Sequence, residues 1–160
     1  MSGLSTYDRQ ILSEADALIH DRFNPSKDLA TLSIEWQTYL AVCSHVELIK
    51  SGGLPFFFDG DFPGNPDYSI FSEAYRRIGC EDMALWLEEA VALFPFNAPH
   101  QNRAKRQAYM KEHCSKGTGE LCELGYRMMD SAEVAYRHLA EFVRMNRVTF
   151  QAGSGGAAAR

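Results

Sequence analysis

The side chains best suited to nucleophilic or metal chemistry are five histidines and four cysteines, and they are scattered along the chain. They are His20, His45, His100, His113, His138, Cys43, Cys80, Cys114 and Cys122. None forms the HExxH, HxH, ExxH or CxxC spacing that brings metal ligands together on one helix face or loop. Cys43 and His45 fall on different faces of a helix, and a nucleophile and its base would have to meet across the fold. The sequence therefore predicts reduced, structural cysteines and no catalytic residue, metal or cofactor.

Three aspartates gather in the longest irregular stretch of the chain, which contains two glycines and two prolines. Asp59, Asp61 and Asn65 are oxygen donors at short spacing, so a calcium loop is one interpretation. The EF-hand pattern needs glycine at its sixth position and glutamate at its twelfth, and counted from Asp59 these positions hold Gly64 and Ile70. Because the bidentate carboxylate is missing, an ordered polar loop is the favoured interpretation.

The formal charge of the chain is divided unevenly along its length. The first hundred residues carry fifteen acidic and six basic side chains and the remaining sixty carry six and ten, so net charges of −9 and +4 make up the total of −5. This polarity argues against a uniform nucleic-acid-binding surface and allows an acidic face that meets a basic partner; merely solvated faces are the plainer alternative. The adjacent pairs Glu81 with Asp82 and Glu88 with Glu89 cannot each share a helix face, so they do not predict paired-carboxylate catalysis.

Length and composition predict one all-α domain over residues 1–150. A chain of 160 residues with 46% hydrophobic side chains can bury a real core without metal or disulfide support. Residues 151–160 are rich in glycine and alanine, and we expect them to form a flexible tail outside the fold. No signal peptide opens the chain and no apolar run is long enough to cross a bilayer, so we expect a cytoplasmic protein without membrane contact.

The element that organises the rest is a helix from Ile34 to Lys50, which is apolar nearly all round and therefore predicted to be buried. Gly52 and Gly53 are predicted to end it, and Phe56 to Phe58 follow as an aromatic plug. The glycines lack the GxxxxGK[ST] continuation of a phosphate loop. Glu47 lies one turn earlier, where we expect it to accept hydrogen bonds from backbone N–H groups of the glycine loop.

Further amphipathic helices are predicted around this one, which gives a bundle of about seven helices. The first runs from Leu4 to His20 and ends at Asn24 and Pro25. Ser69 is predicted to cap the helix after the aspartate loop and Gly79 to close it. A following helix, from Glu81 to Phe94, carries acidic residues in its first turn, where negative charge opposes the helix dipole.

The second half of the chain begins with a basic segment that Pro99 is predicted to open as a helix. We expect this helix to lie on the surface, with Ala104, Ala108 and Tyr109 touching the core. Its four cations are expected to be solvated or to pair with the acidic half of the chain, and binding to a phosphate backbone is the less favoured alternative. The cations are Arg103, Lys105, Arg106 and Lys111. Two final helices follow, and Ser131 or Asp130 is predicted to cap the last of them.

Three short motifs resemble the DNA-mimic protein family. The first is Glu47, Gly52 and Gly53 followed by the pair Phe57 and Phe58. The second is the run 74–80 with its Ile-Gly turn and the alanines of the next helix. The third is the closing helix, in which an asparagine follows an aromatic-aliphatic pair; its residues are Phe142, Val143, Asn146 and Phe150. Together these motifs span about residues 34–150.

The resemblance implies an all-α, often dimeric, cytoplasmic bacterial protein with no known catalysis. One branch of that family imitates the charge pattern of duplex DNA and occupies the DNA-binding surface of a transcription regulator. For this chain the resemblance implies a basic protein partner, such as a DNA-binding regulator, and no direct contact with nucleic acid. The carboxylates nominated for the acidic face are Asp59, Asp61, Asp67, Glu81, Asp82, Glu88 and Glu89.

Two other functions stay open from the sequence. One is a small enzyme or ligand-binding protein, with a pocket lined by Trp36, Tyr39, Phe56 and Phe57 and by a cysteine or histidine. The other is a structural or immunity-type helper protein. A filled aromatic core would argue against the pocket, whereas convergent polar groups in a cavity would favour it.

Overall fold

The computed structural model describes residues 4–22, 28–114 and 117–152, and within these ranges it contains helices and no strand. The predicted all-α fold is thereby confirmed. The elements are α1 (Thr6–Arg22), η1 (Leu29–Thr31), α2 (Ile34–Asp59), α3 (Ser69–Arg77), α4 (Glu81–Ala92), η2 (Pro99–Gln101), α5 (Arg103–His113), α6 (Glu120–Asp130), α7 (Ala132–Met145) and α8 (Arg147–Ala152). The predicted helix end at Asn24 and Pro25, and most of the predicted tail, lie outside the described residues.

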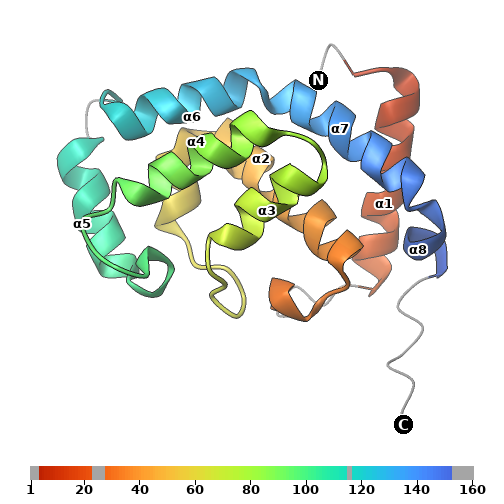
Figure 1. Ribbon diagram of the computed structural model, residues 1–160, viewed down its shortest axis with the longest axis horizontal. Helices are drawn as coiled ribbons and strands as arrows, with labels where there is room; N and C mark the ends of the chain where they lie inside the picture. The colour runs from red at the N-terminus through yellow and green to blue at the C-terminus, as the bar shows by residue number, and fades with distance from the viewer. Residues whose placement is uncertain (1–3, 23–27, 115–116, 153–160) are drawn as a thin grey trace, which may run out of the picture.

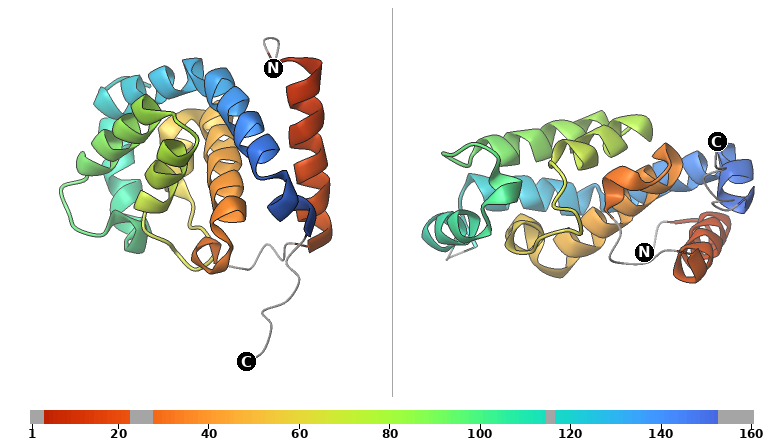
Figure 2. Two further views of the ribbon diagram at one scale, coloured as in Figure 1. Left: turned by 45° about the vertical axis from the view of Figure 1, so that its right-hand side comes forward. Right: turned by 90° about the horizontal axis from the view of Figure 1, so that it is seen from below.

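α2 lies in the middle of the bundle, with α3, α5, α6 and α7 packed around it (Figure 1). α3 and α4 pack on each other and form an outer layer on one side of the molecule, as the view from below in Figure 2 shows. α6 and α7 follow one another along one edge, and α1 packs on α7 at the end opposite α5. The α3–α4 hairpin therefore has one side on the core and one side toward solvent.

The first part of α2 is the buried central helix that the sequence predicts. Tyr39, Val42, Val46 and Ile49 form one stripe and are almost completely buried. The buried surface extends well beyond this stripe, because Gln37, Thr38, Ala41 and His45 are buried too, whereas Glu47 and Lys50 are exposed. Helices packed on several sides of α2 thus bury more than half of its circumference, which stabilises it.

The predicted helix end at Gly52 and Gly53 is confirmed in the backbone, which is non-helical at both glycines, with φ −168° and ψ 20° at Gly52 and φ 71° and ψ −172° at Gly53. The sequence did not predict that a second helical segment follows directly, so that α2 as a whole is a kinked helix that runs to Asp59. Pro55 falls in the first turn after the kink, where its missing N–H costs no hydrogen bond. A Cβ on Gly125 of α6 would lie 3.2 Å from the backbone nitrogen of Leu54, so α6 approaches the kink closely.

The three phenylalanines after the kink do not act as one plug. Phe57 and Phe58 are buried, with their rings 5.0 Å apart, and they pack on the aromatic residues of α3 and its preceding loop. Phe56 points the other way and is 49% exposed, because helical geometry places successive residues about 100° apart. A Cβ on Gly52 would lie 2.7 Å from the Cβ of Phe56, so the kink and the position of Phe56 depend on each other.

The structure also corrects three predicted helix starts. The Ser69 side chain does not cap α3; instead the Asp67 carboxylate accepts a hydrogen bond from the Ser69 backbone N–H at 2.9 Å. Ser131 precedes α7, but its side chain makes no capping hydrogen bond. Pro99 opens the short η2 turn, and α5 begins only at Arg103.

The basic helix α5 is less exposed than predicted. Arg106 is completely buried, and Met110 one turn later is also buried, whereas Ala104 and Ala108 face solvent. The core-facing side of α5 is thus the one that carries Arg106, and only Tyr109 of the three predicted contact residues is partly buried there.

Candidate protein interface on α3 and α4

The turn between α3 and α4 is fixed by Gly79, as predicted. Gly79 has φ 79°, its N–H bonds to the carbonyl of Arg76 at 2.9 Å, and the N–H of Cys80 bonds to the carbonyl of Tyr75 at 2.9 Å. This pair of hydrogen bonds is the Schellman arrangement, which satisfies the last carbonyls of a helix and needs a left-handed residue. It sends the chain directly into α4.

α4 is amphipathic, and its two sides are sharply different. Met83, Ala84, Leu87 and Ala90 are buried against α3 and α6. The solvent-facing side carries four carboxylates and one leucine: Glu81, Asp82, Leu85, Glu88 and Glu89. The two predicted acidic pairs are therefore brought onto one exposed side of one helix, about two turns apart.

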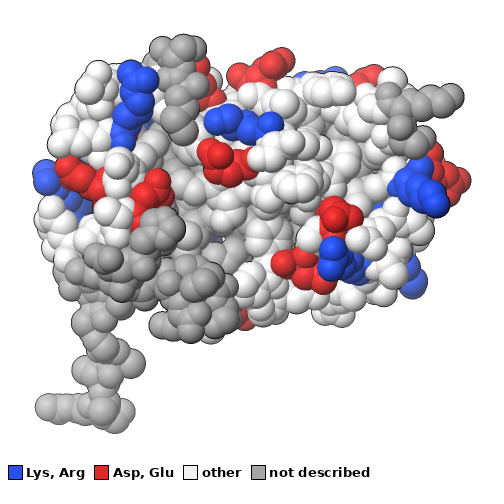
Figure 3. All heavy atoms as spheres, turned by 180° about the vertical axis from the view of Figure 1, so that it is seen from behind, with Lys and Arg blue, Asp and Glu red and all other residues white. Residues whose placement is uncertain are grey.

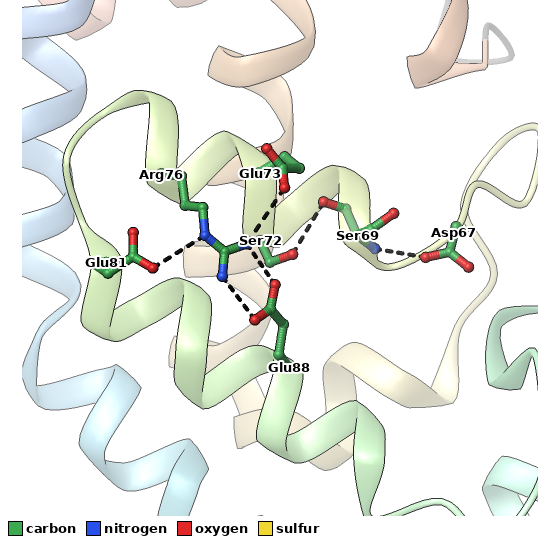
Figure 4. A network of polar contacts seen from close by, with 7 residues as sticks. All are labelled: Asp67, Ser69, Ser72, Glu73, Arg76, Glu81 and Glu88. Carbon is green, nitrogen blue, oxygen red and sulfur yellow. Dashed lines mark hydrogen bonds and ion pairs between the residues drawn. The ribbon is translucent and has the colours of Figure 1, made fainter.

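Arg76 of α3 holds two of these carboxylates, as Figure 4 shows. Its guanidinium donates to both oxygens of Glu88, from Nη1 at 2.6 Å and Nη2 at 2.8 Å, and from Nε to Glu81 at 3.1 Å. Glu73 lies at the edge of the same group, 3.5 Å from Nη1. The bidentate hydrogen bonds from Arg76 lower the pKa of Glu88 below its ordinary value.

The carboxylates of Asp82 and Glu89 differ from those of Glu81 and Glu88 because they make no hydrogen bond and no ion pair within the described part of the chain. From Ser69 to Ala92 the chain carries five carboxylates and two guanidiniums, a net charge of −3. The α3–α4 hairpin is thus acidic in net terms, and its uncompensated charge is concentrated on α4.

Asp67 lies at the start of this hairpin and has a structural role. The hydrogen bond from the Ser69 N–H lowers the pKa of the Asp67 carboxyl, and the Nδ1 atom of His100 lies 3.3 Å from the other carboxylate oxygen. The free N–H groups and the dipole at the N-terminus of α3 also favour the negative charge of Asp67. Asp67 therefore stabilises α3 rather than extending the free charge of α4.

Asp59 and Asp61 lie away from α4 and contact α5. The Asp59 carboxylate accepts from Gln107 at 2.9 Å and lies 3.8 Å from Arg103. Asp61 accepts from Nη2 of the buried Arg106 at 2.7 Å. Five of the seven nominated carboxylates thus have a partner within the fold, and the seven do not form one continuous face.

Arg106 was not recognised from the sequence as a structural residue, yet it is the centre of this region. Besides Asp61, its guanidinium donates to the carbonyls of Phe58, Pro99, His100 and Gly60. No local signal distinguishes it from its exposed neighbours, because all the acceptors come from other segments. The only sequence clue is the polar loop at 59–67, whose carbonyls and carboxylates need donors.

The remaining motif residues have structural roles. Glu47 accepts a hydrogen bond from the Tyr136 hydroxyl, and Lys50 lies 3.8 Å from the same carboxylate, so Glu47 ties α2 to α7 instead of binding the glycine loop as predicted. Asn146 ends α7 by donating from its side-chain nitrogen to the Phe142 carbonyl at 2.8 Å. Its own carbonyl accepts from Phe150 and so begins α8.

The aromatic residues proposed to line a pocket fall into two separate clusters. Trp36 and Tyr39 pack against Phe150, with ring centroids 4.6 Å and 5.9 Å from it. Phe57 instead packs against His45 and Phe71. Tyr39 and Phe57 are almost fully buried, so they fill the core. Phe56 belongs to neither cluster: it is exposed and lines a separate open hollow with Cys114, so the four aromatic side chains do not surround a shared cavity.

The described residues assemble no metal site, and two of the thiols are not activated. The thiols of Cys80 and Cys114 are desolvated, which raises their pKa to about 11 and about 12, so they are protonated at neutral pH. No group of three histidine, cysteine or acidic side chains in the described ranges is placed to hold a metal ion.

The face opposite the hairpin has a different character. In Figure 3, lysine and arginine side chains lie next to aspartate and glutamate side chains, and uncharged residues separate these mixed groups. Among the described helices, none has the length and low charge needed to cross a membrane. The described residues of the face in Figure 3 therefore carry interspersed charges of both signs and no patch of one sign.

Comparisons with known proteins give a match to a sequence model of a protein family. No curated protein and no solved structure matches the chain significantly. The sequence model described as DMP19-like protein matches residues 30–146, which include α2 to α7 and hence both the glycine kink and the α3–α4 hairpin. Since this match covers well over half of the chain, the chain belongs to the DMP19-like protein family.

Proposed function

We propose that this protein is a non-enzymatic interaction protein that binds a basic protein partner through the exposed side of α4. The observation that carries the proposal is the pair Asp82 and Glu89, two exposed carboxylates without an internal partner in the described ranges, on the helix that has the acidic stripe. Exposed charges of one sign steer an oppositely charged partner and orient it at contact. The resemblance to the DNA-mimic family supports a DNA-binding protein as that partner.

The charge density of α4 limits how far it can imitate DNA. A helix of twelve residues is about 18 Å long, and duplex DNA presents about ten phosphate charges over that length. α4 presents four carboxylates, two of which Arg76 already holds. The proposed contact is therefore a small acidic patch that meets a basic surface, and not a duplex-length replica.

The test is a capture experiment with a matched control. The tagged protein is incubated with lysate of its native cell, washed with increasing duplex DNA, and the retained proteins are identified by mass spectrometry. The same is done with Asp82→Asn/Glu89→Gln and with Glu14→Gln/Glu112→Gln, which removes the same charge from α1 and α5. We expect a DNA-binding protein that DNA displaces, and a loss of this protein only with the α4 variant.

Two results would contradict the proposal. Capture that is equal for the wild type and the α4 variant would show that α4 is not the contact. A captured protein that resists displacement by DNA would leave protein binding intact but refute competition with DNA. In either case the variant pair separates a specific role of α4 from the general effect of net charge.

A further inference from the structure

The acidic side of α4 borders a hollow with a mixed polar and apolar lining. The hollow has a volume of about 310 Å³ and lies between the start of α4 and the start of α7. Its apolar lining is formed by Met83 and Trp86 from α4 and Val134 and Ala135 from α7, and its polar lining includes Glu81, Asp82, Ser131 and His138. A surface that only imitates the charge of duplex DNA needs no such hollow. Charge imitation alone therefore does not explain the hollow.

Apolar side chains in and beside the hollow are exposed to solvent. Val134, which lines the hollow, is 40% exposed, and Leu85, which lies outside the lining one turn after Asp82 on α4, is 44% exposed. Trp86, which also lines the hollow, is half-buried. Burying this apolar area in a complex would contribute favourable free energy that scales with the area covered.

The free carboxylates flank this apolar area. Asp82 precedes Trp86 by four residues and Glu89 follows it by three, so both carboxylates are within one helical turn of the indole. The two carboxylates are seven residues apart, which corresponds to about 10 Å along the helix. A partner helix that carries one cation a turn before an apolar side chain and another a turn after it separates its two cations by the same distance.

We infer that the hollow between α4 and α7 receives one apolar side chain of a basic helix, whose flanking lysines or arginines pair with Asp82 and Glu89. This inference rests on the proposed function and adds the chemistry of the partner, a helix of the pattern cation, apolar anchor, cation. His138 can add a polar contact at the wall, because its Nδ1 is held by the Ile78 carbonyl at 2.9 Å and its Nε2 is left as an acceptor in the neutral ring.

The probe is a pair of alanine-based helical peptides. One carries a leucine at its centre with a lysine one turn to either side, and the other carries alanine in place of that leucine. Binding is followed by peptide fluorescence anisotropy and by the fluorescence of Trp86 in a Trp36→Phe background, which leaves a single indole. We expect the leucine peptide to bind about tenfold more tightly and to change the Trp86 emission.

The control variants separate the hollow from the charges. Leu85→Gln/Val134→Gln keeps every charge and should abolish the preference for leucine, whereas Met145→Gln/Val148→Gln, at apolar positions that are 77% and 81% exposed elsewhere, should preserve it. Asp82→Asn/Glu89→Gln should weaken both peptides.

Each outcome has one meaning. Equal affinity for the two peptides, a leucine preference that survives Leu85→Gln/Val134→Gln, or no binding of either peptide overturns the inference. Equal affinity combined with weaker binding to Asp82→Asn/Glu89→Gln leaves the proposed function standing alone. A leucine preference that needs Leu85 and Val134 but is indifferent to the carboxylates supports the hollow and contradicts the proposed role of the acidic patch.

Discussion

Arg106 is the residue on which the loop after α2 depends. A buried guanidinium is tolerated only when its donors are satisfied, and here carbonyls from three segments and the Asp61 carboxylate satisfy them. Removing the side chain leaves those acceptors without partners inside the protein. Removing Asp61 leaves the cation with carbonyl acceptors alone.

Arg106→Met should lower the free energy of unfolding by about 3 kcal/mol, the cost of breaking a buried charge-assisted network. Arg103→Met is the matched control, since the Arg103 side chain is about half exposed and contacts only Asp59, and it should cost less than about 1 kcal/mol. Urea unfolding followed by circular dichroism measures both. Equal losses for the two variants would contradict the structural role given to Arg106.

At the scale of a single residue, sequence reasoning recovered the local features and missed the distant ones. The position of Gly79 was predictable because a glycine between two amphipathic helices is a local signal. The burial of Arg106 was not, because its acceptors lie more than forty residues away for Phe58, Gly60 and Asp61. The same holds for the ion pair of Glu88 with Arg76, which depends on how α4 folds back on α3.

At the scale of elements, the kink in α2 decides where the second half of that helix points. The break itself was predictable, because glycine tolerates the backbone conformation that closes a helix, and both glycines are non-helical. The helix that follows was not predictable: Leu54, Phe57 and Phe58 bury their side chains in the bundle once the chain has turned. This burial depends on packing by α6, which lies far away in the sequence.

Gly53→Ala should therefore destabilise the protein by about 2 kcal/mol, because φ 71° with ψ −172° is a backbone conformation almost restricted to glycine. Gly60→Ala is the control: Gly60 has φ −88°, and a Cβ there would meet no atom within 4 Å. The control should be neutral or slightly stabilising. Thermal unfolding distinguishes them, and an unchanged midpoint for Gly53→Ala would show that the kink can relax without cost.

The exposed stripe of α4 was predictable in part. The acidic residues of its first turn were read correctly from the sequence, and the burial of Met83 and Leu87 follows from their helical spacing. The hollow beside the stripe was not predictable, because its second wall comes from α7, about fifty residues later.

At the scale of the whole molecule, the core contains one titratable side chain that weakens the fold in acid. His45 is fully buried, its Nδ1 lies 2.7 Å from the Tyr75 hydroxyl, and its Nε2 has no partner. Burial lowers the pKa of His45 from 6.5 to about 3. Between these two pH values the unfolded chain binds a proton on this imidazole and the folded protein does not. The free energy of unfolding therefore falls as the pH drops from 6.5 toward 3.

Between pH 7 and pH 5, this single group should remove about 2 kcal/mol of stability, as 1.36 kcal/mol per pH unit below the unfolded pKa predicts. His45→Gln should be less stable at pH 7 but should lose less on acidification, whereas His113→Gln, at an exposed position, should follow the wild type. Urea unfolding at the two pH values tests this. A parallel pH dependence for all three proteins would remove His45 as the cause.

The central place of α2 also has a consequence for synthesis on the ribosome. Its apolar circumference is covered by α6, α7 and α8 as well as by α3, and the contact between Glu47 and Tyr136 joins residues 89 positions apart. While the C-terminal helices are still in the exit tunnel, α2 has no complete cover and remains an apolar surface that chaperones recognise. The nascent chain therefore completes its core only after α8 has left the tunnel, so a product truncated before α8 would be a target for proteolysis.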